Sequence, residues 1–524
     1  MSPAAKRWIL SGGAVAVIAI VVAALLMLRG GSGAPAPASA TSDEDAGSVV
    51  TRYLQAWSQG RDPEAGALTD DPAKAVAEFQ AIRASLRPTA LAATLRQVTG
   101  QSALVGVRWT FGSARVWSYE TKLALVSGAG GWRVHFTPAS VHPELGAGDT
   151  LVMRGASGGT AAVDRDGKPL LTWQSDGPKA TDPAVAPLLV PGIGRLLGPG
   201  AAAWSVSRVD SAGKEHELYH EGQVRGAPET TSLSITAQNA AQAAVDAQST
   251  PAMLVAIQPS TGDVLAVARN SAATDGNPLS GLYAPGSTFK IATAAAVLEQ
   301  GLAEANTALP CPGTAQIGQR TIPNDDQFSF ASLPLHSAFA HSCNTTFAQL
   351  ASQLPADGLA KAASQFGLNA DFDIPGITTE AGKVTAATSP AELVESAIGQ
   401  GTVQASPFGL TLMAATVAAG KPVTPQLMRA HPTKVGTGYQ APPGGVITTL
   451  RSMMREVVTG GTATGLQGSG QVYGKTGTAQ FGDGTHANGW FAGYRGDVAF
   501  SVLLLGSDSS KPAVSAAAAF LGRL

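Results

Sequence analysis

The stretch GLYAPGSTFKIATAAAVLEQG, residues 281–301, sets a serine and a lysine at the start of an apolar helix. A proline and a glycine precede the serine, and the sequence predicts a helix from Thr288 to Gly301, a typical stop signal. Ser287 and Lys290 are three residues apart, so their side chains lie on one side of this helix. A serine hydroxyl becomes a strong nucleophile only when a neighbouring base takes its proton, and a neutral lysine can be that base.

The protonation state of Lys290 decides whether this pair can do chemistry. Burial, the positive end of the helix dipole and a second cation nearby each lower the pKa of a lysine and so favour its neutral form. An isolated S-x-x-K pattern, however, is usually an exposed lysine whose aliphatic stem covers an apolar helix face. The catalytic interpretation therefore depends on the rest of the chain.

Two further motifs support the catalytic interpretation. SCN at residues 342–344 stands between two helical stretches, and KTGT at residues 475–478 stands in a strand-like run. Class A β-lactamases and penicillin-binding proteins carry S-x-x-K, S-D-N and K-T-G in this order. The chain has all three, with Cys343 in place of the aspartate. Each motif is common by itself, but the ordered set points to acyl transfer at Ser287.

On these motifs the chain resembles a class B penicillin-binding protein, a peptidoglycan D,D-transpeptidase, of the subgroup with an NTF2-like N-terminal domain. Residues 397–415 and 488–494 are similar to the family's segments flanking the third motif, and residues 153–171 are similar to the opening of its linker domain. The resemblance implies a multidomain α+β protein. Its C-terminal domain would have the serine β-lactamase/transpeptidase-like fold, an antiparallel sheet flanked by helices, preceded by an NTF2-like α+β domain and a β-rich linker domain.

The resemblance implies a catalytic role for five residues. Ser287 would be the acylated nucleophile and Lys290 the base that activates it. Ser342 would relay the proton toward the leaving amine with the help of Lys475, whose charge also lowers the pKa of Lys290. Asn344 would hold Lys290 and the amide of the substrate. No histidine is required, and none of the eight histidines has an evident partner for a Ser-His-Asp mechanism.

The resemblance implies that the third motif binds the substrate. The hydroxyl groups of Thr476 and Thr478 would bind the terminal carboxylate of the donor peptide, and Gly477 would let the substrate strand lie against this segment. The backbone N–H groups of Ser287 and Thr478 would form the oxyanion hole. The resemblance implies no metal and no cofactor.

The implied reaction is cross-linking of peptidoglycan stem peptides through a Ser287 acyl-enzyme, and β-lactam antibiotics would acylate the same serine. No catalytic carboxylate cluster stands before Thr230, so we expect a monofunctional enzyme whose glycosyltransferase partner is a separate protein. A serine β-lactamase is an alternative, but it needs a base for water, and the candidate glutamates have no E-x-x-x-N context. These candidates are Glu380, Glu392, Glu395 and Glu456. A sensor that binds muropeptides or β-lactams without turnover is a second alternative.

The N-terminus predicts a membrane anchor. Residues 8–28 are uncharged, and a helix that spans a bilayer needs about 20 apolar residues. Lys6 and Arg7 precede this run, so the positive-inside rule places the short N-terminus in the cytoplasm and the rest of the chain on the other side of the cell membrane. A cleaved signal peptide is the alternative, since Ala-Ser-Ala at residues 38–40 resembles a cleavage site.

Composition and periodicity, together with what the resemblance implies, divide the chain into five segments. They are residues 1–30 as cytoplasmic tip and transmembrane anchor, 31–42 as linker, 43–145 as NTF2-like domain, 146–229 as linker or dimerisation-like domain, and 230–524 as penicillin-binding transpeptidase domain. In the NTF2-like segment, apolar residues at i, i+3, i+4 and i+7 from Val50 to Trp57 predict one buried helix face, and strand-like runs follow. No convergent polar set is visible there, so a spacer is favoured over a ligand pocket.

The chain has two cysteines, Cys311 and Cys343, an even number that suits an oxidising compartment. A disulfide between them would close a loop worth roughly 3–4 kcal/mol in the chain-entropy model. Two free buried thiols are the alternative.

Two features limit other functions. Charged residues make up 14% of the chain and the formal net charge is −2, which argues against a nucleic-acid partner. The sequence GASGG at residues 155–159 matches the G-x-S-x-G pattern of hydrolases, but it lacks a preceding buried strand and a following helix. We therefore interpret it as a turn.

Overall fold

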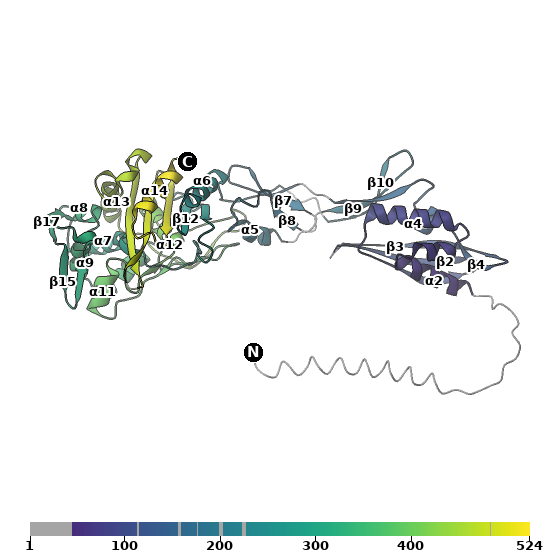
Figure 1. Cartoon of the computed structure of the whole chain (residues 1–524), viewed down its shortest axis with the longest axis horizontal. Coiled ribbons are helices and arrows are strands. Elements are labelled where there is room, and N and C mark those ends of the chain that lie inside the picture. Colours follow the sequence, from purple (N-terminus) through teal and green to yellow (C-terminus); the bar gives the residue numbers. More distant parts are fainter. Residues whose placement is uncertain are drawn as a thin grey trace, which may run out of the picture. The chain divides into compact units, whose positions relative to one another are not determined.

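The computed structural model describes most of the chain from residue 45 onward (Figure 1). The described residues are 45–112, 115–155, 159–174, 177–198, 203–222, 227–482 and 484–524. They divide into two compact units: the first runs to Val152 and includes Arg208–His216, and the second consists of Met153–Ser207 and Glu217–Leu524. The predicted anchor and the linker at residues 31–42 lie outside the described residues. Among the helices of the described residues, none is long and apolar enough to span a bilayer.

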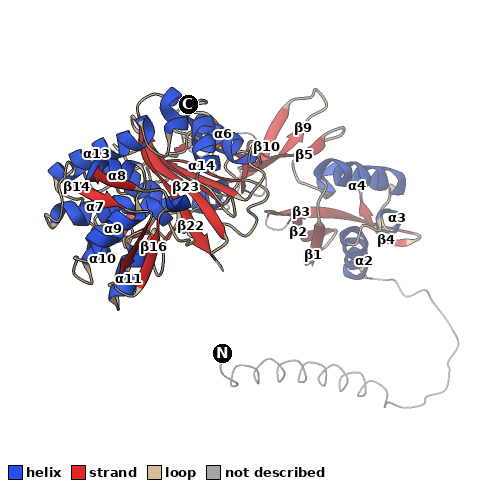
Figure 2. Cartoon of the chain, turned by 60° about the vertical axis from the view of Figure 1, so that its left-hand side comes forward, coloured by secondary structure: helices blue, strands red, loops and turns tan. Residues whose placement is uncertain are grey.

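The first unit combines three helices with a four-stranded antiparallel sheet (Figure 2). The helices are α2 (Ala46–Ser58), α3 (Asp62–Ala67) and α4 (Pro72–Leu86), and the strands, in sheet order, are β1 (Ala90–Thr99), β2 (Ser102–Phe111), β3 (Arg115–Gly128) and β4 (Gly131–His135). The carboxylate of Asp45 caps α2, because it accepts a hydrogen bond from the backbone N–H of Ser48 at 2.8 Å. The apolar face predicted between Val50 and Trp57 is buried.

Aromatic side chains fill the interior of this unit. The ring of Trp57 meets that of Trp109 edge-on at 5.8 Å and lies 5.5 Å from that of Phe79. Phe79 in turn meets Phe136 edge-on at 5.5 Å. All four side chains are at most 3% exposed, and such ring pairs add to the stability that burial supplies. The helices and the sheet therefore enclose a packed aromatic core.

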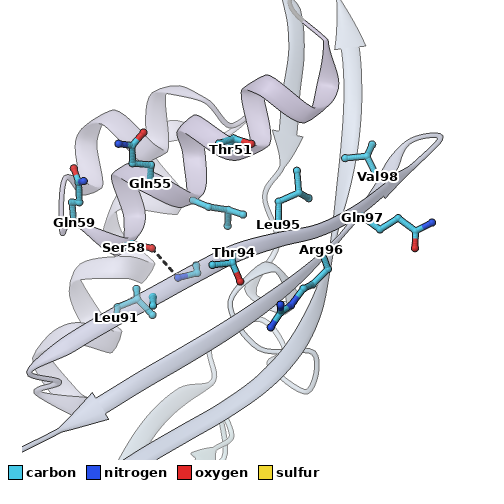
Figure 3. A pocket seen from close by; sticks show the side chains of 13 residues that line it. Thr51, Gln55, Ser58, Gln59, Leu91, Thr94, Leu95, Arg96, Gln97 and Val98 are labelled. Carbon is cyan, nitrogen blue, oxygen red and sulfur yellow. Dashed lines mark hydrogen bonds between the residues drawn. The ribbon is translucent and has the colours of Figure 1, made fainter. Parts of the chain in front are cut away.

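A groove of about 780 Å³ runs between α2 and the edge strand β1 (Figure 3). The hydroxyl of Ser58 accepts a hydrogen bond from the backbone N–H of Ala93 at 2.9 Å and so joins the two sides. Apart from Arg96, the side chains that line the groove are apolar or uncharged. The groove brings no set of charged groups together, and the spacer role of this domain stays a prediction.

Short strands make up most of the middle of the chain. They form a four-stranded sheet in the order β11 (Glu229–Thr230), β6 (Thr160–Val163), β7 (Pro169–Gln174), β8 (Gly177–Ala180), and a three-stranded sheet in the order β10 (Glu215–Glu221), β9 (Trp204–Val209), β5 (Thr150–Gly155). Helix α5 (Val190–Leu197) contacts β7 and β8. A turn at residues 165–167 joins β6 to β7. The G-x-S-x-G pattern includes residues 156–158, which lie outside the described residues.

A five-stranded antiparallel sheet forms the centre of the C-terminal domain, as predicted (Figure 2). In sheet order its strands are β13 (Val264–Arg269), β12 (Ala252–Ile257), β24 (Val498–Leu504), β23 (His486–Arg495) and β22 (Val472–Phe481). Helices α6 (Ile235–Asp246) and α14 (Lys511–Leu521) pack on each other and on the sheet, and α12 (Pro407–Ala419) also packs on the sheet. Every residue of β12 is buried, so both faces of the sheet are covered, while β22 remains an edge strand.

Further helices and short strand pairs complete the C-terminal domain, and the first two motifs lie at the starts of two of these helices. The helices are α7 (Lys290–Glu299), α8 (Leu335–Ala340), α9 (Asn344–Ala351), α10 (Gly358–Ser364), α11 (Pro390–Ser396) and α13 (Gly444–Thr459). The paired strands are β14 (Ala308–Cys311) with β17 (Phe330–Pro334), β15 (Thr314–Ile317) with β16 (Arg320–Pro323), β18 (Asp371–Asp373) with β21 (Lys434–Thr437), and β19 (Gly382–Lys383) with β20 (Gln404–Ala405). The helix predicted from Thr288 begins as a 3-10 turn, Gly286–Phe289, and becomes α-helical at Lys290.

Candidate active site

Ser287 and Lys290 lie side by side at the start of α7. Ser287 belongs to the 3-10 turn, Lys290 is the first residue of the α-helix, and 3.0 Å separates Lys290 Nζ from Ser287 Oγ. The turn lies close to β22, since a Cβ on Gly286 would stand 2.5 Å from the carbonyl oxygen of Thr478. Gly286 also has a φ of +53°, so only glycine meets both demands without strain.

The second motif converges on the amine of Lys290. Ser342 lies in the turn between α8 and α9, and Asn344 is the first residue of α9. Lys290 Nζ lies 2.6 Å from Asn344 Oδ1, 2.7 Å from the carbonyl oxygen of Ser342 and 3.3 Å from Ser342 Oγ. With a φ of 64°, Ser342 has the left-handed backbone that is rare for residues other than glycine and recurs at active sites.

Lys475 on the edge strand β22 completes this hydrogen-bond network. Its Nζ lies 2.9 Å from Ser342 Oγ and 3.1 Å from the carbonyl oxygen of Thr476. Lys475 is fully buried, like Lys290, and its Nζ lies 5.6 Å from the centre of the Phe339 ring. The fold therefore brings the three predicted motifs to one place, although Ser342 and Lys475 are 133 residues apart in the chain.

Burial governs the protonation of both lysines. It lowers the pKa of Lys290 well below the usual 10.5, and the charge of Lys475 lowers it further, whereas Asp325 acts in the opposite direction. Burial lowers the pKa of Lys475 to about 7. A neutral Lys290 beside Ser287 Oγ can accept the hydroxyl proton, which is what a serine nucleophile requires.

A cleft of about 860 Å³ opens onto this network. It is lined by Ser287, residues 323–328, Phe330, His341, Ser342, Asn344, Ile398, Gln400, Thr462, Thr476, Thr478, Gln480 and Ser510. Two residues of the third motif, Thr476 and Thr478, thus face the place where a substrate would bind.

Gly477 lies where the packing of the chain leaves no room for a side chain. A Cβ at this position would stand 2.7 Å from the carbonyl oxygen of Pro285 and 2.9 Å from Thr288 Cγ2. The missing side chain therefore allows β22 to lie against the turn that carries Ser287. This glycine therefore gives room to the protein's own backbone, and its implied role toward the substrate strand stays a prediction.

Two residues of the cleft wall were not predicted from the sequence. Thr462 Oγ1 lies 2.5 Å from Thr476 Oγ1 and so orients a hydroxyl of the third motif. Asn324 accepts hydrogen bonds from the start of α9. Both residues lie in loops, where a single polar residue belongs to no periodic pattern or motif, so the sequence carries no signal for either.

A disulfide joins Cys311 to Cys343, the pair considered from the sequence. It links the last residue of β14 to the residue that precedes α9, in the middle of the second motif. Both cysteines are fully buried. The bond therefore holds the second motif to a neighbouring strand.

Replacing both cysteines with alanine should lower the free energy of unfolding by roughly 3–4 kcal/mol. The unfolded chain would regain the freedom of a loop whose ends are 32 residues apart. Urea unfolding of the oxidised wild type and of the Cys311→Ala/Cys343→Ala variant measures the difference, and reduced wild type should resemble the variant. Equal midpoints for all three samples would contradict this expectation.

The glutamates considered for water activation lie outside the described lining of the cleft. Three of them bind other side chains: Glu392 binds Thr402, Glu395 binds Arg320 and Glu456 binds His336. The carboxylates that do line the cleft are those of Asp325 and Asp326.

Two families of known proteins match the chain. The family described as penicillin binding protein transpeptidase domain matches residues 252–522, more than half of the 524 residues. The chain belongs to the penicillin-binding proteins. The family described as NTF2-like N-terminal transpeptidase domain matches residues 45–149. This penicillin-binding protein is therefore a class B member with an NTF2-like domain, as the resemblance implied.

Curated relatives of this penicillin-binding protein are similar over part of their length. The peptidoglycan D,D-transpeptidase PbpA of Mycobacterium tuberculosis is 32% identical over 201 residues, which cover 32% of this chain and 40% of the relative. The peptidoglycan D,D-transpeptidase MrdA of Acinetobacter baumannii is 30% identical over 223 residues, which cover 38% of this chain and 33% of the relative. The match thus spans 40% or less of the length of these relatives.

Solved structures share the fold of this penicillin-binding protein. The D,D-transpeptidase domain of a peptidoglycan glycosyltransferase from Eggerthella lenta superposes with a TM-score of 0.56 at 24% identity, over 71% of this chain and 98% of that chain. Penicillin-binding protein A of M. tuberculosis, solved as a ceftriaxone acyl-enzyme complex, superposes with a TM-score of 0.55 at 21% identity, over 70% and 98%. At these sequence identities the structural similarity establishes the fold of the chain and nothing further.

Proposed function

We propose that this penicillin-binding protein is a monofunctional peptidoglycan D,D-transpeptidase that works through an acyl-enzyme on Ser287. One observation carries the proposal: the buried amine of Lys290 lies within hydrogen-bond distance of Ser287 Oγ, Ser342 Oγ and Asn344 Oδ1. The donor is a stem peptide that ends in D-Ala-D-Ala. A β-lactam antibiotic acylates the same hydroxyl.

The first half-reaction forms the acyl-enzyme. Neutral Lys290 takes the proton of Ser287 Oγ, 3.0 Å away, while this oxygen attacks the carbonyl carbon of the D-Ala-D-Ala bond. The backbone N–H groups of Ser287 and Thr478 stabilise the negative charge that develops on the carbonyl oxygen. The proton passes to Ser342 Oγ, 3.3 Å from Lys290 Nζ, and then to the leaving amine of D-Ala. Lys475, 2.9 Å from the same hydroxyl oxygen, supports this transfer.

The second half-reaction uses the same groups in reverse. The amine of a neighbouring stem peptide attacks the acyl carbon, loses its proton through Ser342 and Lys290, and the proton returns to Ser287 Oγ as the acyl bond to the enzyme breaks. The hydroxyls of Thr476 and Thr478 bind the carboxylate of the donor, with the positive field of Lys475 nearby. The products are D-Ala and a cross-linked peptide.

The proposal includes the location and partners of the chain. Residues 1–30 would anchor it in the cell membrane with a single span, and residues 31–42 would link this anchor to the domains outside the cytoplasm. The NTF2-like domain would act as a spacer, and residues 146–229 would form a linker or dimerisation-like domain. The uncharged run at residues 8–28 supports the anchor. A separate glycosyltransferase would make the glycan strands that this enzyme cross-links.

Transpeptidation by the full chain tests the proposed function. The protein is mixed with a synthetic stem peptide ending in D-Ala-D-Ala and an amine acceptor, and mass spectrometry follows D-Ala and the joined peptide. Both products should appear with wild type and not with Ser287→Ala. If benzylpenicillin is instead hydrolysed with turnover, the protein is a β-lactamase. If it is bound covalently while no peptide product ever forms, the protein is a sensor.

The rate of acylation should depend on pH in a way set by the two lysines. Lys290 must be neutral to act as a base, so the rate should rise with pH as Lys290 loses its proton, at a pH well below 10.5 because burial and Lys475 lower its pKa. Burial lowers the pKa of Lys475 to about 7, so above that pH the loss of its charge should weaken its support for the proton transfer and reduce the rate. Benzylpenicillin labelling between pH 5 and 10 measures the profile. A single rise near pH 10.5 would show that Lys290 is solvated.

A further inference from the structure

Asn324 is a buried polar residue of the cleft wall to which no catalytic role has been given above. It follows β16 and is 3% exposed. Its backbone N–H donates a hydrogen bond to the carbonyl oxygen of Gly313 at 2.8 Å, which continues the pairing of β15 with β16 by one residue. Both the oxygen and the nitrogen of a buried amide need hydrogen-bond partners, so these partners identify the segments that the side chain connects.

The oxygen of the Asn324 side chain caps α9. Asn324 Oδ1 accepts hydrogen bonds from the backbone N–H of Asn344 at 2.8 Å and from that of Thr345 at 3.2 Å. These are the first two residues of the helix, whose N–H groups have no partner within it. Cys343, the residue that normally supplies such a cap, makes no side-chain capping bond. The cap therefore comes from a residue 20 positions earlier in the chain.

The nitrogen of the same side chain holds the cap to its surroundings. Asn324 Nδ2 donates to the carbonyl oxygens of Pro312 and Phe328, each at 2.9 Å, and lies 3.3 Å from the sulfur of Cys311. Three acceptors on one side and two donors on the other leave the amide one orientation. The residue thus connects the start of α9 to the strand that carries the disulfide.

The neighbouring carbonyl group orients the side chain of Asn344. Asn344 Nδ2 donates to the carbonyl oxygen of Pro323 at 2.9 Å, which leaves Asn344 Oδ1 facing Lys290 Nζ at 2.6 Å. The pair 323–324 therefore holds Asn344 at both its backbone and its side chain. Ser342 lies two residues before Asn344, in the turn that leads into α9.

We propose that Asn324 is a positioning residue of the acylation reaction. From its place in the cleft wall it holds the start of α9, and with it the second motif, against Lys290. Its side-chain hydrogen bonds go to the start of α9 and to residues 311, 312 and 328, not to Ser287, so it would act through Asn344 and Ser342. The inference rests on the proposed function, because it assumes that Ser287 is acylated. A displacement of about 1 Å at reacting groups can reduce a rate by about 10²-fold.

The test compares Asn324→Ala with a matched control, Asn270→Ala. Asn270 is 5% exposed, accepts a hydrogen bond from the N–H of Ala252 at 3.0 Å, and donates to three backbone carbonyl groups away from the cleft. Labelling of the full chain over a range of benzylpenicillin concentrations separates the limiting acylation rate from the dissociation constant of the non-covalent complex. Thermal unfolding of each variant gives its stability.

Asn324→Ala should lower the limiting acylation rate by about 10²-fold and change the dissociation constant little. Asn270→Ala should lower the thermal midpoint and leave the limiting rate unchanged. Asn324→Asp keeps the acceptor for the two N–H groups of α9, so its limiting rate should lie between those of Asn324→Ala and wild type.

Three results would overturn the inference. A limiting rate of Asn324→Ala equal to that of wild type would show that the cap does not position the motif. Equal rate losses in Asn324→Ala and Asn270→Ala would show a general loss of structure. A wild type that forms no adduct would overturn the proposed function together with this inference, whereas the first two results leave the proposed function standing.

Discussion

Ser287→Ala is expected to abolish covalent labelling of the full chain by benzylpenicillin. Wild type should gain the mass of one drug molecule and keep it, because Ser287 Oγ attacks the β-lactam carbonyl and none of the four glutamates considered above is among the described residues that line the cleft. The alanine variant lacks the attacking oxygen, so no adduct should form. Intact-mass spectrometry, followed over time, measures both proteins.

Ser352→Ala is the control for this labelling experiment. Ser352 is an exposed serine that follows α9, and its variant should be labelled like wild type. An adduct on Ser287→Ala would place the nucleophile elsewhere in the chain. A wild-type adduct that disappears while hydrolysed drug accumulates would favour the β-lactamase alternative.

Lys290→Met is expected to slow acylation by benzylpenicillin by roughly 10²–10⁴-fold, the usual contribution of a general base. Methionine fills a buried space of similar length but cannot take the proton from Ser287 Oγ. The fold should persist, because loss of the hydrogen bonds to Asn344 and Ser342 is offset by removal of a buried amine that is costly to desolvate. Labelling rates and thermal midpoints, measured on the same samples, separate the two effects.

Lys361→Met provides the matched control. Lys361 is an exposed lysine of α10 that pairs with Asp357 at 2.7 Å, an ion pair of the kind that adds little to stability. Its variant should keep both the labelling rate and the thermal midpoint of wild type. If Lys290→Met reacts as fast as wild type, the proton of Ser287 leaves by another route, and Lys475 becomes the base to examine.

The sequence predicted those parts of the fold that depend on residues close together in the chain. The apolar positions from Val50 to Trp57 predicted the buried face of α2, since helical periodicity places them on one side. The strand-like runs predicted the strands of the first unit, and the resemblance carried by the ordered motifs implied a sheet flanked by helices in the C-terminal domain. The start of α7 was placed two residues early, because a short 3-10 turn has the same residue preferences as a first α-helical turn.

The candidate site was predicted less completely than the fold. The residues of the three motifs were named because each motif has a fixed local spacing. The structure places Ser287, Ser342 and Asn344 around the amine of Lys290, and Lys475 against Ser342. Thr462 and Asn324 were missed, since each acts through one contact with a distant segment. The packing reason for Gly477 was also missed, because only the folded structure shows that a Cβ there would meet Pro285 and Thr288.

The sequence by itself determined which chemical groups this protein has and in what order: a serine with a lysine one turn away, a serine and asparagine in the second motif, and a lysine with two threonines in the third. Tertiary structure alone decided that these groups meet, that both lysines are buried enough for their pKa values to fall, and that Asn324 caps the helix of the second motif. The physical reason is the distance along the chain over which each effect acts. Periodicity and motif spacing reflect neighbours within a few residues, whereas desolvation and hydrogen-bond geometry depend on segments that only folding brings together.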